Sequence, residues 1–348
     1  MNTLTRRRVL QALAAVGGAS ILQVPAVRAA TEELVVTTYG GSWEAFWRDT
    51  LMPDFTARTG IAPRVDTGLG RVYTTNMRAA GVENPPYSVV MTNEIFSTVL
   101  RAEGYFEEWD LSKVPNYADL YPVATRRAGA FGAVGMVSPI GIGYRTDMLS
   151  TRPTAWKDLW EIEEFRGQLG LYNIVNSAGK MFLMMTSKIF GADIYDIDTG
   201  FAKLTELGRV YQTDFNMSTA FAAGEIAIAP FDFGEIARLR SQGLPVDCII
   251  PEEGMMMWDQ TFSIARNLPN IDDAYAYVNY ILSPEAQDLL MREFFVSPVN
   301  TKVQVPKDLL VDVPVTGAAM DSFIDWDWEW VNANTEELTR RWNEVFGA

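Results

Sequence analysis

Short apolar runs rich in β-branched residues alternate along the chain with longer amphipathic segments. Each run is bounded by turn-forming residues, and a run of this kind predicts a strand. The predicted strands are Leu34–Thr38, Tyr87–Met91, Gln168–Tyr172, Ala227–Pro230, Val246–Pro251 and Thr261–Ala265. Strands that alternate with helical segments indicate an α/β fold.

Three helices are predicted towards the C-terminus. Ser283, Pro284 and Glu285 supply an N-cap, a proline at the first helical position and an early acid, so a helix begins there. The segment before it and the last segment of the chain each carry an apolar stripe at helical spacing. The stripes consist of Ala274, Val278, Ile281 and Leu282 in the first case and of Leu338, Trp342, Val345 and Phe346 in the second. We expect the last helix to pack on the lobe that it joins.

Polar, aromatic and glycine residues follow the predicted strands. In α/β sheets a ligand binds beyond the carboxyl ends of the strands, so these positions are candidate ligand-binding residues. The glycines after the first strand allow backbone amides to approach a ligand, and a helix is predicted to begin at Ser42. The candidates after the first four strands are Tyr39, Gly40 and Trp43, then Thr92, Asn93 and Glu94, then Asn173, and finally Asp232 and Phe233.

The first 29 residues have the pattern of an export signal. Arg6–Arg8 precede the apolar stretch Leu10–Leu22, which is shorter than the roughly 20 residues of a membrane-spanning helix. Small side chains at Val27 and Ala29 predict cleavage after Ala29. The consecutive arginines predict export by the twin-arginine translocase, which carries folded proteins. No cysteine stands beside the cleavage site to accept a lipid. We therefore expect an unanchored protein in the periplasm.

Charge and composition narrow the possible functions. Removal of residues 1–29 takes away four of 29 basic residues and no acid, which leaves 25 basic against 44 acidic residues and a net charge of -19. This balance argues against nucleic acid as a partner. The sequence has no histidine, which removes the commonest general base and metal ligand. Phosphate-cradling and dinucleotide motifs are also missing, so no cofactor and no metal are expected. An exported hydrolase that uses two carboxylates remains an alternative.

The chain resembles the periplasmic solute-binding proteins of ABC transporters, in the branch typified by spermidine/putrescine-binding proteins. The similarity runs over most of the chain after the export signal. It is most specific where Gly243–Asp247, Pro251–Gly254 and Trp258 follow that family's order and spacing. Further similar segments are Leu34–Trp43, Tyr87–Asp110, Thr154–Gly167 and Ser283–Gln287.

The resemblance implies an α/β, two-lobed periplasmic binding protein fold of type II, with hinge strands that cross between the lobes. Lobe one is expected at residues 30–138 and 259–302, and lobe two at residues 139–258 and 303–348. The two lobes would close over a small solute, and the closed form would deliver it to a permease in the inner membrane. The resemblance therefore implies a transport protein and not an enzyme, and we expect a monomer.

The residues that the resemblance places in the cleft differ in part from the family's. Trp258 matches an aromatic wall and Thr92 matches a cleft hydroxyl. Glu94 stands where the family has a tyrosine, Asp232 falls at or beside a tryptophan, and Gln260 replaces an aspartate with Asp259 one place early. Where polyamine binders have an acidic pair, this chain has Asn173 and the neutral run Val175–Ser177.

These differences leave two classes of amine open as the ligand, a polyamine and an ω-amino acid. Glu94, with Asp232 or Asp259, would hold one ammonium group. Asn173, the glycine amides and Arg71 would then meet a neutral or anionic end. Ferric iron is a further alternative, but its binders in neighbouring branches supply adjacent tyrosines and this chain has no Tyr-Tyr pair.

Overall fold

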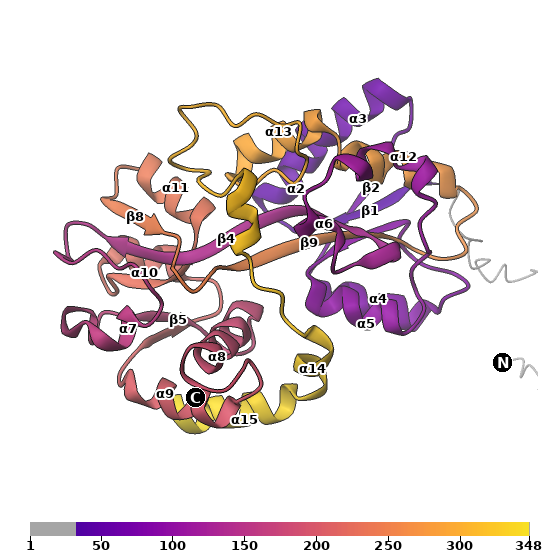
Figure 1. Ribbon diagram of the computed structural model, residues 1–348. Helices are drawn as coiled ribbons and strands as arrows, with labels where there is room; N and C mark the ends of the chain where they lie inside the picture. Colours follow the sequence, from indigo (N-terminus) through magenta and orange to yellow (C-terminus); the bar gives the residue numbers. More distant parts are fainter. Residues whose placement is uncertain (1–32, 348) are drawn as a thin grey trace, which may run out of the picture.

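The computed structural model describes residues 33–347, so the predicted export signal lies outside the described residues. Two lobes flank a pair of long strands, β4 (Ala133–Arg145) and β9 (Met256–Ile264), that run from one lobe into the other (Figure 1). The two strands are antiparallel neighbours, with Met136 opposite Gln260 and Ser138 opposite Trp258. They confirm the prediction of an α/β fold with two lobes and crossing strands.

The main sheet has the strand order β2-β1-β3-β9-β4-β7, and β8 also pairs with β4. Strands β1, β2 and β3 are parallel, whereas β9 runs antiparallel to β3. A second sheet in lobe two consists of the parallel strands β5 and β6. The remaining strand bounds are β1 Val35–Thr38, β2 Arg64–Thr67, β3 Val89–Thr92, β5 Gly170–Tyr172, β6 Tyr211–Thr213, β7 Ile228–Asp232 and β8 Val246–Ile249.

All six strands predicted from apolar runs are present. The last of them, β9, begins five residues earlier than predicted, so Trp258, Asp259 and Gln260 lie within the strand. Two observed strands, β2 and β6, were not predicted, and β4 was expected only through the resemblance, as a hinge strand that crosses between the lobes at 138/139. The edge strand β2 is half exposed and carries no apolar run. In β4, Gly141 interrupts the apolar pattern because a side chain there would come within 2.3 Å of the Ile249 carbonyl oxygen.

Helices cover both faces of the sheet. In lobe one they are α2 (Ser42–Phe46), α3 (Met52–Thr59, joined to α2 by the π-helical turn Trp47–Leu51), α4 (Gly70–Ala80), α5 (Glu94–Ala102), α6 (Pro122–Thr125), α12 (Ile271–Ile281) and α13 (Pro284–Phe294). In lobe two they are α7 (Asp158–Glu161), α8 (Ser177–Phe190), α9 (Ile197–Glu206), α10 (Met217–Ala223), α11 (Phe233–Ser241), α14 (Trp328–Ala333) and α15 (Thr335–Phe346).

The three predicted C-terminal helices are confirmed. Ser283 caps α13, because its Oγ accepts a hydrogen bond of 3.2 Å from the Ala286 amide. The stripe of α12 is buried in lobe one. In α15, Leu338 and Trp342 are buried, and the Trp342 indole donates a 2.7 Å hydrogen bond to Gln212 Oε1 of strand β6. The last helix therefore packs on lobe two.

Each lobe has its own apolar core. The lobe-one core surrounds β1 and β3, and the lobe-two core surrounds β5, β7 and α8. Near the end of the chain, Phe323 packs in the lobe-one core and Trp326 packs in the lobe-two core, so a third passage between the lobes lies there. No helix within residues 33–347 is long and apolar enough to span a membrane.

Candidate functional site

A cleft of about 370 Å³ lies between the two lobes. Lobe one supplies one wall, lobe two supplies the other, and the crossing strand β9 contributes Trp258 and Gln260. The wall residues are Tyr39, Trp43, Leu69, Gly70, Arg71, Asn93, Ile95 and Phe96 from lobe one, and Val175, Asn176, Ser177 and Phe215 from lobe two. A site built from both lobes is suited to a ligand that holds the two lobes together.

Three helices begin at the cleft. Gly70 is the first residue of α4, Ile95 is the second residue of α5 and Ser177 is the first residue of α8, and all three line the cleft. The first amide groups of a helix have no partner within the helix, and its dipole is positive at this end. The three helix starts therefore make the potential in the cleft more positive.

Aromatic rings form much of the apolar wall. Trp43 stacks on Phe294 with ring centroids 4.4 Å apart, and Tyr39 meets Trp43 edge to face at 5.3 Å. Across the cleft, Trp258 packs edge to face on buried Tyr172 at 5.2 Å. These contacts hold the two tryptophan rings in place, so both can contact the aliphatic part of a solute without further ordering.

Three neutral polar side chains meet at the lobe-one end of β9. The Tyr39 hydroxyl donates a 2.7 Å hydrogen bond to Gln260 Oε1 and lies 3.3 Å from Asn93 Oδ1. Asn93 Nδ2 in turn donates to the Asp259 carbonyl oxygen at 2.6 Å. Burial, followed by the nearby Asp259 carboxylate, raises the pKa of Tyr39, so the phenol stays protonated. The cluster offers acceptor oxygens to a solute without carrying a charge of its own.

Arg71 is the one charged residue among those that line the cleft, and no carboxylate of residues 33–347 lines it. Arg71 belongs to the first turn of α4, close to the exposed rim of the cleft. A guanidinium can pair with a carboxylate through two parallel hydrogen bonds. The cleft can therefore pair with an anionic group through Arg71, but it offers no acid to an ammonium group.

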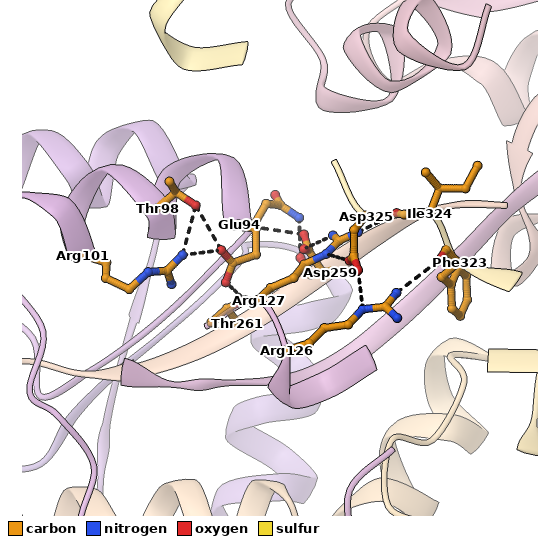
Figure 2. Close-up of polar contacts among 11 residues, drawn as sticks. Glu94, Thr98, Arg101, Arg126, Arg127, Asp259, Thr261, Phe323, Ile324 and Asp325 are labelled. Atoms are coloured by element: carbon orange, nitrogen blue, oxygen red, sulfur yellow. Dashed lines mark hydrogen bonds and ion pairs between the residues drawn. The ribbon is translucent and has the colours of Figure 1, made fainter. Parts of the chain in front are cut away.

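Glu94, a predicted ligand residue, is instead buried inside lobe one. Its side chain is 1 % exposed and accepts hydrogen bonds from Thr98, Arg101 and Thr261, the Arg101 contact being 2.9 Å (Figure 2). A buried carboxylate is costly unless it is paired and hydrogen-bonded, and this one is satisfied by three partners. Its position serves the packing of α5 on β9.

Asp259 is also buried, within the same region of lobe one. Its carboxylate is 3.1 Å from Arg127 Nη1 and accepts a 3.2 Å hydrogen bond from the Glu94 amide (Figure 2). Burial raises the pKa of Asp259, and the Arg127 guanidinium opposes that change. Arg127 also binds Asp325 at 2.6 Å and donates to the Ile324 carbonyl at 2.6 Å. The pair thus ties the start of α5 to the third passage between the lobes.

Asp232 and Phe233 mark the start of α11 in lobe two. Asp232 is the N-cap of this helix, and its Oδ1 accepts a 3.0 Å hydrogen bond from the Glu235 amide. Burial, followed by the charge of Glu235, raises the pKa of Asp232 to about 7. Phe233 is buried against Gly141 of the crossing strand. Neither residue lines the cleft.

The structure places three further predicted residues beside the cleft but not among the residues that line it. Gly40 is exposed at the end of β1, and Thr92 is fully buried beside Gly70, with no partner for its hydroxyl among the described residues. Asn173 Oδ1 accepts a 3.1 Å hydrogen bond from the Val175 amide and so shapes the turn before α8. Of the twelve predicted ligand residues, the cleft brings together Tyr39, Trp43, Asn93, Trp258 and Gln260.

Several lining residues were not predicted. Ile95 and Phe96 lie in the first turn of α5, directly after the predicted strand-end residues, so extension of that prediction by one helical turn would have found them. Leu69 and Phe215 lie in loops, and no local pattern marks them. The sequence marks Val175–Ser177 only as a neutral run at the place where polyamine binders have an acidic pair, and it does not predict that these residues line the cleft.

The comparisons with known proteins agree with this arrangement. The model of the family described as bacterial extracellular solute-binding proteins matches residues 50–314. The chain belongs to that family. It is 24% identical over 299 residues to the spermidine/putrescine-binding periplasmic protein 1 of Haemophilus influenzae, with 81% of each chain covered. It is 22% identical over 256 residues to the γ-aminobutyric acid-binding protein of Pseudomonas aeruginosa, with 69% of this chain and 70% of the relative covered.

The fold is shared with solved structures. A crystal structure of an ABC transporter protein from Clostridium perfringens superimposes with a TM-score of 0.79 at 23% identity, covering 90% of this chain and all of the other. At this identity the likeness concerns the fold alone. Family and fold together confirm the expected two-lobed solute-binding protein of type II.

Proposed function

We propose that this protein is the substrate-binding component of an ABC importer and that it captures a small zwitterion, an ω-amino acid, in the periplasm. Arg71 carries this proposal, because among residues 33–347 it is the one charged group that lines the cleft. It would pair with the carboxylate of the solute. The ring faces of Tyr39, Trp43 and Trp258, with the Asn93 oxygen, would receive the ammonium end.

The relatives support an amine as the solute. They are named for spermidine and putrescine and, in one case, for γ-aminobutyric acid. A diamine or polyamine carries ammonium groups at both ends and needs carboxylates to meet them. Glu94 and Asp259 are already paired with Arg101 and Arg127. A ligand with one amine and one carboxylate fits the cleft better.

We also propose how the protein is exported, how it delivers its solute and where its chain passes between the lobes. The chain would be exported folded by the twin-arginine translocase, act as a monomer and deliver its solute to an inner-membrane permease without catalysing a reaction. It would pass between the lobes near 138/139, near 258/259 and, from the packing of Phe323 and Trp326, near 324. That third passage lies later in the chain than the boundary at 302/303 expected from the sequence.

Calorimetric titration with γ-aminobutyrate and putrescine tests the ligand class. We expect γ-aminobutyrate to bind more tightly than putrescine, and Arg71→Gln to weaken γ-aminobutyrate binding by about 10- to 100-fold, the worth of a charge-assisted hydrogen bond. Arg78→Gln is the matched control, because Arg78 lies on the same helix and pairs with Glu103 away from the cleft. Tighter binding of putrescine, or equal losses in both variants, would refute the zwitterion.

A further inference from the structure

A lysine is buried behind the lobe-two wall of the cleft. Lys180 lies in the first turns of α8 and is 4% exposed. Its Nζ donates a 2.6 Å hydrogen bond to the Ile174 carbonyl oxygen and lies 3.5 Å from the Val175 carbonyl oxygen. These carbonyls belong to the turn that carries Val175, Asn176 and Ser177 into the cleft.

Within residues 33–347, Lys180 has no carboxylate partner. Two other cations of that range with nearly buried side chains, Arg127 and Arg145, are paired with Asp259 at 3.1 Å and with Asp147 at 2.7 Å. Burial lowers the pKa of Lys180 to about 8, which reflects the cost of the charge. A buried cation is normally paired with an anion. Two carbonyl oxygens satisfy hydrogen bonds of Lys180 but do not neutralise it.

The position of Lys180 in its helix adds to that cost. A positive charge near the start of a helix is unfavourable because the helix dipole is positive at that end. A neutral side chain of similar length, such as methionine, would fill the same space without a charge, with the loss of the hydrogen bond to the Ile174 carbonyl oxygen. The charge is therefore unexplained by packing, and it lies on the opposite side of the cleft from Arg71.

We propose that Lys180 determines ligand specificity, with the anionic group of the bound solute as its missing counter-ion. The inference rests on the proposed function. With the lobes closed, Lys180 acts across the Ile174–Val175 turn from lobe two while Arg71 acts from lobe one. The two cations then favour a carboxylate in the cleft and repel a solute that carries only ammonium groups.

Lys180→Met tests this proposal, since it removes the charge and preserves most of the volume. We expect the variant to bind γ-aminobutyrate about tenfold more weakly and putrescine more tightly than the unaltered protein. Opposite changes for the two solutes separate an electrostatic role from a structural one, because a distorted turn would weaken both. Lys180→Arg should retain the original order of affinities.

Lys188→Met is the matched control, because Lys188 is exposed on the same helix two turns further on. It should change neither affinity. Circular dichroism and thermal melting establish that each variant is folded, and Lys180→Gln replaces Lys180→Met if the latter is not. Equal or absent effects of Lys180→Met on the two solutes overturn the proposal.

The two proposals can fail separately. Failure of the unaltered protein to bind γ-aminobutyrate refutes the proposed function, and Lys180 is then judged on putrescine. In that case, a gain in putrescine affinity in Lys180→Met supports the repulsive role of Lys180. No gain, including no binding of putrescine by either protein, overturns it.

Discussion

The cleft and the buried ion pairs beside it contain neighbouring residues whose side chains have opposite surroundings. We call the pairs Glu94–Arg101 and Asp259–Arg127 the ionic network. Along β9, Trp258 and Gln260 line the cleft, whereas Asp259 between them is buried against Arg127. At the start of α5, Asn93 lines the cleft and Glu94 is buried against Arg101. Successive side chains of a strand point to opposite faces, so adjacent residues of β9 belong to different regions, one to the cleft and the next to the ionic network.

The difference shows that closeness to a strand end does not make a side chain a ligand residue. The acids of the network have cations of the protein itself as partners, and their hydrogen bonds are satisfied (Figure 2). The described part of the chain lines the cleft with amides, aromatic rings and a single guanidinium. Changes in the network should therefore affect stability, and changes in the cleft should affect affinity.

The largest expected effect is on the network. Arg127→Met should lower the free energy of unfolding by about 3–5 kcal/mol, because it leaves Asp259 buried without its cation. Urea unfolding measures this loss. Arg340→Met, which removes an exposed ion pair with Glu337, should cost less than about 1 kcal/mol. Similar losses in the two variants would show that removal of Arg127 does not leave Asp259 as an unpaired buried charge.

Asp232 is buried like the network acids, but hydrogen bonds from the α11 backbone hold it instead of a close cation. Its pKa is raised from 3.8 to about 7, so the folded state binds the proton more tightly than the unfolded state does. The stability that it contributes is present below about pH 4 and is lost as the pH rises to about 7. The full difference corresponds to about 4 kcal/mol as an upper limit.

Asp232→Asn should therefore be more stable than the unaltered protein at pH 8, since asparagine also caps a helix. The gap should close at pH 4, as measured by unfolding at both values. Asp196→Asn is the matched control at the N-cap of α9, where backbone hydrogen bonds lower the pKa of the acid. Asp196→Asn should be less stable than the unaltered protein above about pH 4, and that gap should close as the pH falls below about 4. A constant gap for Asp232→Asn would contradict the assignment.

On the side of the cleft, Trp258→Ala should weaken γ-aminobutyrate binding by about 30-fold or more, the loss typical of a central tryptophan in a binding site. Far-ultraviolet circular dichroism should be unchanged. Trp330→Ala removes a partly exposed tryptophan that packs on Tyr195, away from the cleft, and should leave affinity intact. Unaltered affinity in Trp258→Ala would place the solute elsewhere.

The smallest effect is expected at the rim. Phe215 is 73% exposed and lines the lobe-two side of the cleft. Closure over a solute should bury part of its ring, so Phe215→Ser should weaken binding by about two- to fivefold, mainly through faster dissociation. Stopped-flow kinetics measures both rates. Val311→Ser, at an exposed apolar position outside the cleft, is the control. A change in both variants would point to a general surface effect.

The amino-acid sequence alone predicts the secondary-structure elements with continuous apolar runs or helix caps, and it carries the resemblance to a family. These features are local, because strand propensity, helix stripes and the Ser283 cap depend on residues a few positions apart. It also identified Tyr39, Trp43 and Asn93 by their places after predicted strands, and Trp258 and Gln260 through the resemblance, and the cleft brings these five residues together.

Which of the candidate side chains face the cleft and which are buried depends on contacts between distant parts of the chain. The Arg127–Asp259 pair joins residues 132 positions apart, and the Thr261–Glu94 hydrogen bond spans 167 positions. Alternation along a strand is visible in a sequence, but the face that meets a cleft depends on where the strand crosses between the lobes. For the same reason, the sequence does not show that Lys180 lies next to the cleft. That proximity follows from the position of the Ile174–Val175 turn, which leads into the cleft wall.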